Sequence, residues 1–254
     1  MGKTYIKAEK YLKIHDSKKS IFLEIGSERD QGSTTYFVDL AKKYNVDFYS
    51  VDIKQDIKKI KHLKKNKNFH LQTGFDGTEW CKKVLPTLEK KVSVLYLDNF
   101  DYNFWPPTIT KNKYNNFAGS DWPQFEILID NPDIIEKYNK NTKKEILDLL
   151  GNDYDILKNL KNRKEKYLQY NIEYSNTNSQ IEHFKQLLEI YPYLDNQCVI
   201  VFDDTARENG AWVGKNGPGV VFLLAKGFTL VEEIAIHPTN NHEFDYSVVL
   251  VREK

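Results

Sequence analysis

The stretch SIFLEIGSERDQGST, residues 20–34, joins a short apolar run to a polar turn that contains glycine. The run IFLEI (21–25) predicts a buried β-strand, and a helix is expected from Gly32 onward. A strand, a glycine, a polar turn and a helix together form the general outline of a turn that holds a nucleotide. Glycine lets a ligand approach the backbone, and the first turn of the helix presents free N–H groups.

This turn matches neither common phosphate-binding pattern. No lysine follows Gly32, as the GxxxxGK[ST] loop requires, and the two glycines fit GxGxxG poorly. Taken alone, the turn is equally compatible with ligand binding and with an ordinary connection between a strand and a helix. Its interpretation therefore depends on the sequence that follows.

Apolar runs alternate with amphipathic segments on both sides of a long interruption. This alternation predicts an α/β fold with a Rossmann-like, doubly wound, mostly parallel seven-stranded sheet. The last two strands are expected to form an antiparallel pair. The predicted strands are 21–25, 46–53, 68–73, 92–98, 198–204, 228–236 and 244–252. The predicted helices are 32–44, 54–65, 77–89, 179–191 and 218–226.

Residues 101–175 interrupt the alternation after the fourth strand. A structureless loop of this length would be unusual in a compact domain, so we expect a helical insertion within a single domain spanning 1–254. Aromatic side chains at its start could stack on a sugar or a base, or could form the insertion's own small core. An alternative role for the insertion is oligomerisation. The aromatics concerned are Tyr102, Phe104, Trp105, Tyr114 and Trp122.

Composition excludes several classes of protein. The 254 residues carry 37 Lys and Arg against 36 Asp and Glu, which argues against a dedicated nucleic-acid binder. No apolar run approaches the roughly 20 residues that span a bilayer. The two cysteines, Cys81 and Cys198, cannot form a disulfide framework. We therefore expect a soluble cytoplasmic protein, with a homo-oligomer as one open possibility.

Acidic residues close the second and third predicted strands. Asp52 lies 26 positions after Gly26, where a carboxylate can accept both hydroxyl protons of a ribose. Asp76 follows the third strand. The carboxyl ends of adjacent parallel strands border one crevice, and an acidic crevice suits a ligand with a ribose and a cationic centre better than a pyrophosphate. The alternative is that Asp52 and Asp76 are helix N-caps.

With these features the chain resembles the class I S-adenosylmethionine-dependent methyltransferases, most clearly in the closing antiparallel pair. The resemblance implies S-adenosylmethionine as the cofactor and assigns it a set of residues. Glu24 and Gly26, with Ser27 in the same turn, would border the methionine moiety. Asp52 would hold the ribose. Phe75 and Asp76 would flank the adenine. The chain departs from the family at 27–30, where further glycine is usual.

A second acidic group closes the fourth and fifth predicted strands. Asp98 ends LYLD, and Asp203 and Asp204 end CVIVFDD. Three convergent carboxylates suit Mg²⁺ or another hard divalent cation, which would lower the pKa of an acceptor hydroxyl. Segment 181–205 also resembles the metal-dependent O-methyltransferases, which implies Asp98, Asp203 and Asp204 as metal ligands. The alternative is that the Asp-Asp pair caps the next turn.

Two further residues have a potential role in catalysis. His183, on the helix before the fifth strand, is the histidine best placed to reach the crevice, and an imidazole of ordinary pKa suits a general base. A packed or surface histidine is the alternative. Lys215 lies among glycines that predict a flexible loop, which could fold over a phosphate on the acceptor or form only a tight turn.

The resulting hypothesis is a metal-assisted, S-adenosylmethionine-dependent O-methyltransferase with His183 and Asp98 in catalysis. The resemblance implies a small-molecule acceptor, such as the hydroxyl of a sugar or sugar nucleotide used in surface polysaccharide assembly. Three alternatives remain open. The chain could methylate a phosphate or phosphoramidate oxygen on a nucleotide carrier. It could be an oxygenase related to the cephalosporin hydroxylases, or a non-catalytic scaffold.

Overall fold

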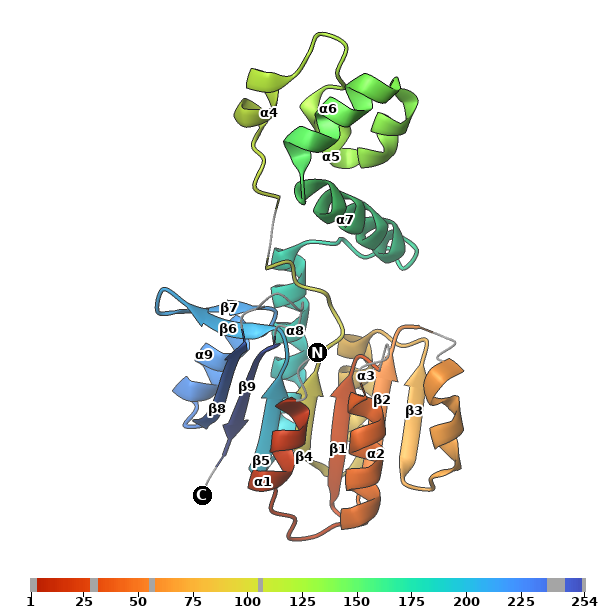
Figure 1. The fold of residues 1–254 in the computed structure, drawn as a ribbon. Helices are drawn as coiled ribbons and strands as arrows, with labels where there is room; N and C mark the ends of the chain where they lie inside the picture. Colours follow the sequence, from red (N-terminus) through yellow and green to blue (C-terminus); the bar gives the residue numbers. More distant parts are fainter. Residues whose placement is uncertain (1–3, 28–31, 55–57, 105–106, 237–244, 253–254) are drawn as a thin grey trace. The chain divides into compact units, whose positions relative to one another are not determined.

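The computed structural model describes residues 4–27, 32–54, 58–104, 107–236 and 245–252. Its centre is a seven-stranded sheet with the strand order β3-β2-β1-β4-β5-β9-β8 (Figure 1). The strands are β1 (Ser20–Ile25), β2 (Asp47–Asp52), β3 (Phe69–Thr73), β4 (Lys91–Leu97), β5 (Leu194–Phe202), β8 (Thr229–Ile236) and β9 (Asp245–Val251).

Strand directions confirm the predicted fold class. The strands β1 to β5 run parallel, whereas β9 pairs antiparallel with both β5 and β8. The central strands are mostly buried, as strands covered on both faces should be. Because β1 to β5 are parallel, their carboxyl ends all meet at one edge of the sheet, and the residues discussed below follow those ends.

Helices cover both faces of the sheet. Side chains that alternate along each strand divide into two apolar cores: Leu23 and Ile200 belong to one, Phe22 and Val201 to the other. The first core packs against α3 (Gly77–Lys83), η3 (Leu85–Leu88), α8 (Asn176–Ile190) and α9 (Gly217–Ala225). The second packs against η1 (Thr4–Lys7), α1 (Ala8–Tyr11), α2 (Ser33–Tyr44) and η2 (Lys58–Lys65).

Residues Asn103–Ser175 form a compact unit separate from Met1–Tyr102 and Asn176–Lys254. This unit is helical and has its own apolar core. Tyr114 is buried there, with its ring centroid 5.7 Å from that of Trp122 and 5.5 Å from that of Phe125. Its elements are α4 (Lys111–Phe117), α5 (Phe125–Asp130), η4 (Pro132–Lys137), α6 (Lys140–Leu150) and α7 (Asp153–Leu168).

Some expectations for these elements need correction, and some fall on undescribed residues. The helix expected over 77–89 is divided into α3 and η3, and the one over 54–65 is a 3₁₀ helix where it is described. Burial of Tyr114 against Trp122 and Phe125 agrees with the alternative that the aromatics form the insertion's own core. Trp105 and most of the turn at 27–30 lie outside the described residues.

A second, two-stranded sheet was not predicted. The strands β6 (Thr205–Glu208) and β7 (Ala211–Gly214) form a hairpin directly after β5, where a flexible loop was expected. Its turn is Asn209–Gly210, and both residues have positive φ (50° and 81°), as a two-residue type I′ turn requires. Asn-Gly between two short runs is the strongest local hairpin signal, so the sequence did carry this information.

Candidate functional site

The carboxylate of Asp52 lies at the end of β2, beside the turn that follows β1. It accepts the backbone N–H of Ser27 at 2.9 Å and that of Lys54 at 2.7 Å. The turn after β3 is adjacent, because the N–H groups of Gly74 and Phe75 donate to the Asp52 carbonyl at 2.9 and 3.4 Å. Asp52 is therefore not a helix N-cap. Its carboxylate links the turns that follow β1 and β2.

Phe75 and Asp76 extend from the neighbouring strand end. Phe75 is one of the exposed large apolar side chains, with 39% of its surface accessible. Asp76 accepts the N–H of Glu79 at 2.9 Å and so caps α3, as the alternative interpretation had it. An exposed ring next to a half-buried carboxylate gives this side of the edge one flat apolar surface and one group that accepts hydrogen bonds.

Gly26 has a structural reason for being glycine. Its φ is +97°, and a Cβ built on it would lie 2.5 Å from the Asp98 carbonyl oxygen and 2.6 Å from the Asn99 backbone. The chain that leaves β4 thus passes directly over the turn that leaves β1. Any side chain at this position would separate the two strand ends.

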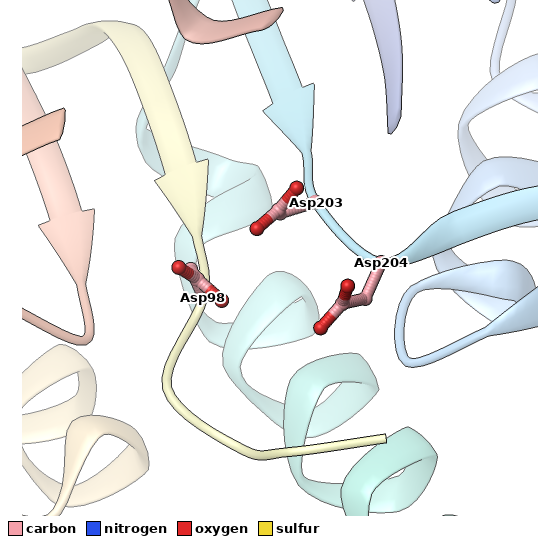
Figure 2. A group of neighbouring side chains, drawn as sticks. All are labelled: Asp98, Asp203 and Asp204. Carbon is pink, nitrogen blue, oxygen red and sulfur yellow. The ribbon is translucent and has the colours of Figure 1, made fainter. Parts of the chain in front are cut away.

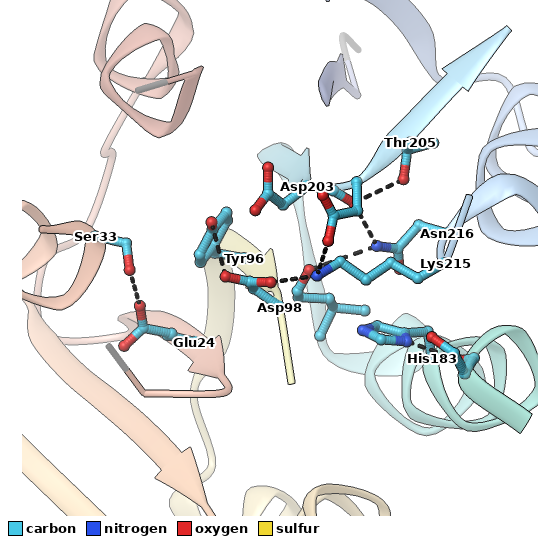
Figure 3. A network of polar contacts seen from close by, with 12 residues as sticks. Glu24, Ser33, Tyr96, Asp98, His183, Asp203, Thr205, Lys215 and Asn216 are labelled. Atoms are coloured by element: carbon cyan, nitrogen blue, oxygen red, sulfur yellow. Dashed lines mark hydrogen bonds and ion pairs between the residues drawn. The ribbon is translucent and has the colours of Figure 1, made fainter. Parts of the chain in front are cut away.

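Glu24 lies at the centre of a buried group of hydroxyls. The hydroxyl of Ser33 donates to its carboxylate at 2.9 Å (Figure 3). The hydroxyls of Thr34 and Ser50 donate to it at 2.8 and 2.6 Å, and Ser50 Oγ lies 2.7 Å from Ser27 Oγ. Burial raises the pKa of Glu24 to about 8, against the opposing effect of the three hydroxyls. At neutral pH this carboxyl is therefore mostly uncharged, and it fixes the start of α2 against β1 and β2.

The three predicted metal ligands do come together. Asp98 follows β4, Asp203 and Asp204 follow β5, and carboxylate oxygens of all three lie within 4.8 Å of one another (Figure 2). Tyr96 donates its hydroxyl to Asp98 Oδ2 at 3.3 Å. Asp204 has a φ of 45°, in the left-handed region, which turns the chain sharply into the hairpin.

A lysine lies within this acidic cluster. The ammonium of Lys215 donates to Asp98 Oδ1 (Figure 3) and lies 2.9 Å from Asp204 Oδ2. The Lys215 side chain is only 2% exposed, compared with 20% for Asp98 and 32% for Asp204. Burial alone would lower the pKa of Lys215, but the negative charges of the three aspartates outweigh it and raise that pKa. Lys215 is therefore a buried cation.

The ammonium bears on whether a divalent ion fits here. Three carboxylates are suitable ligands for Mg²⁺, but two of them already bind the Lys215 ammonium. An ion on the same oxygens would lie a few ångströms from that ammonium, and the two cations would repel each other. In this arrangement the cluster does not fit a divalent metal. Metal ligation by Asp98, Asp203 and Asp204 stays a prediction that requires Lys215 to move.

His183 is buried rather than exposed to the crevice. Its Nδ1 lies 2.8 Å from the Ser179 carbonyl, so Nδ1 carries the proton and Nε2 is the acceptor. Among the described residues, Nε2 is buried without a hydrogen-bond partner. Burial first, and the charge of Lys215 second, lower the pKa of His183 to about 3. The imidazole is thus neutral at physiological pH and a weaker base than the sequence suggested.

Sequence reasoning assigned Lys215 to a phosphate and did not consider Asn216. The Asn216 side-chain amide donates to the Leu97 carbonyl at 3.4 Å and to the Asp203 carbonyl at 3.3 Å, so it links the ends of β4 and β5. The Asn-Gly turn was the available signal. A hairpin there returns the chain to the end of β5, which places the residues after β7 beside the acids.

Comparison with known proteins adds little. No family model and no curated protein matches the chain. A solved structure of LepI in complex with SAM is similar at a TM-score of 0.39 and 11% sequence identity. That match covers 97% of this chain but 46% of the LepI chain, so this chain spans just under half of LepI's length. A similarity this weak assigns no function. Separately, within the described part of the chain, every helix is too short or too polar to cross a membrane.

Proposed function

We propose that the protein is an S-adenosylmethionine-dependent O-methyltransferase acting on a hydroxyl of a small polar acceptor. The observation that carries this proposal is the arrangement of Asp52, Ser27 and Phe75 at the carboxyl edge of the sheet. Asp52 offers a half-buried carboxylate next to the Ser27 turn, and Phe75, whose side chain is exposed, donates its backbone N–H to the Asp52 carbonyl. Ligands of open α/β sheets bind at this edge.

The chemistry of these groups matches the proposed cofactor. A carboxylate is the natural partner for two ribose hydroxyls, and an aromatic ring stacks on adenine. S-adenosylmethionine would supply an electrophilic methyl group, whose carbon–sulfur bond breaks as the acceptor oxygen takes the methyl carbon. The acceptor hydroxyl must lose its proton in the same reaction.

The protein would hold and activate the acceptor at the other half of the edge. Asp98 follows β4, which lies next to β1, and Asp203 follows β5, which lies next to β4, so both lie at the same sheet edge as the proposed cofactor site. A carboxylate there would accept the hydroxyl proton. His183 Nε2 is a second acceptor in the same region, made weak by its low pKa. Because Lys215 binds two of the three acids, the proposal contains no step that needs a metal.

The acceptor class comes from the sequence resemblance. A sugar or sugar-nucleotide hydroxyl of surface polysaccharide assembly is the first choice, and a phosphate or phosphoramidate oxygen on a nucleotide carrier is the second. The second choice is less well supported, because Lys215 is buried and already contacts two acids, which leaves one of its three N–H donors for an anion. The insertion, residues 101–175, is proposed to select the acceptor.

Calorimetric titration with S-adenosylmethionine tests the proposal first. We expect micromolar binding, followed by a mass gain of about 14 daltons, one CH₂, on one member of a panel of sugar nucleotides. An oxygenase related to the cephalosporin hydroxylases would instead bind iron and add oxygen to its substrate. A non-catalytic scaffold would do neither. Absence of donor binding in folded protein would refute the proposal.

A further inference from the structure

The acidic cluster contains its own positive charge. Of the charged side chains there, Lys215 is the most deeply buried, and it contacts one carboxylate from each strand end, Asp98 after β4 and Asp204 after β5. These are the positions whose oxygens a divalent ion would need. The ammonium therefore competes with a metal both for the lone pairs and for the space between the strands.

We propose that Lys215 is a built-in cation that takes the place of a divalent metal in the Asp98, Asp203 and Asp204 cluster, so that this site works without a bound metal ion. The proposal concerns only residues of this chain and the geometry that joins them. It reverses the prediction made from the sequence, which assigned the same three carboxylates to Mg²⁺.

The backbone holds the lysine in this position. The Lys215 N–H donates to the Asp204 carbonyl at 3.0 Å. A Cβ on Gly214 would lie 2.0 Å from that same carbonyl oxygen, so only glycine permits this approach. From the other side, Gln180 of α8 donates its amide to the Gly214 carbonyl at 2.9 Å. These contacts hold the backbone of Gly214 and Lys215 in place, and from this position the Lys215 ammonium reaches both Asp98 and Asp204.

The hairpin explains how one lysine arrives between two strand ends. The strands β6 and β7 leave the end of β5 and return to it through the Asn209–Gly210 turn. Thr205, the first residue of the hairpin, pairs with Gly214, the last. Lys215 follows directly, and Asn216 then ties the chain to the carbonyls of Leu97 and Asp203. The hairpin thus delivers a cation to a fixed point of the sheet edge.

A second consequence rests on the proposed function. An ammonium has three N–H donors, and within the described residues Lys215 uses two of them, on Asp98 and Asp204. The third would donate to the acceptor oxygen and stabilise its negative charge as the proton leaves. A fixed donor at that point needs no rearrangement during the reaction. Lys215 would then act on the acceptor as the metal was expected to act.

Binding of Mn²⁺ tests the first step without any substrate. Protein freed of metal with EDTA and then dialysed is titrated with Mn²⁺, and bound ion is measured by electron paramagnetic resonance. We expect no stoichiometric binding to the wild type. Lys215→Ala should gain one site, at least tenfold tighter than any binding by the wild type, and adding Asp98→Asn should remove it. Lys226→Ala, which changes an exposed lysine at the end of α9, should gain none.

Two results would overturn the proposal. One is stoichiometric Mn²⁺ binding by the wild type that is lost in Asp204→Asn, since the metal and the lysine would then coexist. The other is a folded Lys215→Ala protein that binds no Mn²⁺, since something besides the lysine would keep the ion out. If circular dichroism shows that Lys215→Ala is unfolded, Lys215→Met serves with the same reading, and the wild-type titration stands on its own.

Activity separates this proposal from the proposed function. If a methyl acceptor is found, the EDTA-treated wild type should keep its full turnover. Lys215→Ala should lose at least tenfold and regain part of that loss with Mg²⁺. Loss of wild-type turnover in EDTA, restored by Mg²⁺, would refute the built-in cation. Failure to bind S-adenosylmethionine would refute the methyltransferase assignment and leave the Mn²⁺ result unaffected.

Discussion

The two halves of the sheet edge deal with buried acids in different ways. On the β1–β2 side, Glu24 is surrounded by three hydroxyls, and burial raises its pKa to about 8, so it is mostly uncharged at neutral pH. On the β4–β5 side, the positively charged ammonium of Lys215 contacts both Asp98 and Asp204. One half is neutralised by a proton and the other by an ammonium.

The difference shows that the role and the charge of an acidic residue at a strand end depend on the groups that surround it. Hydroxyls can stabilise a carboxyl in either protonation state, so Glu24 suits a structural position whose charge can change. An ammonium stabilises only the ionised form, so Lys215 opposes the burial that raises the pKa of Asp204. Substitutions can remove or measure this difference between Glu24 and the Lys215 cluster, and the largest loss of stability is expected at Lys215.

Removing the Lys215 ammonium should reduce the stability of the protein more than any other substitution proposed here. Lys215→Met leaves two partly buried carboxylates without their cation, and we expect the free energy of unfolding at pH 7 to fall by about 2–4 kcal/mol. At an acidic pH of about 4 the deficit should be smaller, because burial raises the pKa of Asp204 and an uncharged Asp204 does not need the ammonium. Urea denaturation at both pH values measures it. Lys226→Met, at an exposed site, should change stability by less than about 0.5 kcal/mol. Equal losses of stability in the two variants would show that the Lys215 ammonium does not stabilise the acidic cluster.

Glu24 should make stability fall with rising pH. Its pKa is raised on folding, so its contribution is fully present below the unfolded value near 4.5 and is lost as pH rises through about 8. Glu24→Gln cannot ionise, so relative to the wild type it should gain on the order of 4 kcal/mol between pH 5 and 9. Urea denaturation across this range measures the difference. A constant difference at every pH would show that Glu24 is ionised in the folded protein.

Donor binding should depend on Asp52 at one end of β2 and not on Asp47 at the other. Asp52→Ala should weaken S-adenosylmethionine binding by about 1–3 kcal/mol, since the ribose hydroxyls lose their acceptor. Asp47→Ala is the matched control, because it removes a carboxylate from the opposite end of the same strand, where it binds Lys90. Calorimetry on both folded variants decides. Equal losses would indicate a general effect on the sheet.

The insertion should have the smallest effect on the donor. Trp122→Ala should raise the acceptor KM while S-adenosylmethionine affinity stays within about tenfold, or 1.4 kcal/mol. Phe117→Ala, at an exposed position of the same unit, is the control. Steady-state kinetics measures the acceptor KM, and calorimetry measures the S-adenosylmethionine affinity. If Trp122→Ala instead changes the mass seen by light scattering and leaves per-site kinetics normal, residues 103–175 serve oligomerisation.

Much of the fold could be predicted because its signals are local. Four apolar runs separated by amphipathic segments gave the first four parallel strands, and the last two runs gave the antiparallel pair. Convergence of Asp98 with Asp203 followed from the rule that parallel strands end at one edge. The helix covering 77–89 was less accurate, because a proline at position 86 begins a separate 3₁₀ turn.

The roles of individual side chains were harder to predict, since they depend on distant neighbours. Nothing near Glu24 in sequence shows that Ser50 will donate to it, and nothing near Asp98 indicates Lys215. His183 has an ordinary helical context, yet its burial lowers its pKa to about 3. The hairpin is an exception, because its Asn-Gly turn is a local signal in the sequence, which we had interpreted as part of a flexible loop.

The ion pair between Asp98 and Lys215 also has a consequence for the order of folding. The two residues are 117 positions apart, so their contact closes a long loop and can form only after β4 and β5 have paired. The helical unit between those strands has contacts of its own and can become compact earlier, which shortens the effective loop. Contacts that form late influence unfolding more than folding. In stopped-flow experiments, substitutions at Lys215 should therefore speed unfolding and leave the refolding rate nearly unchanged.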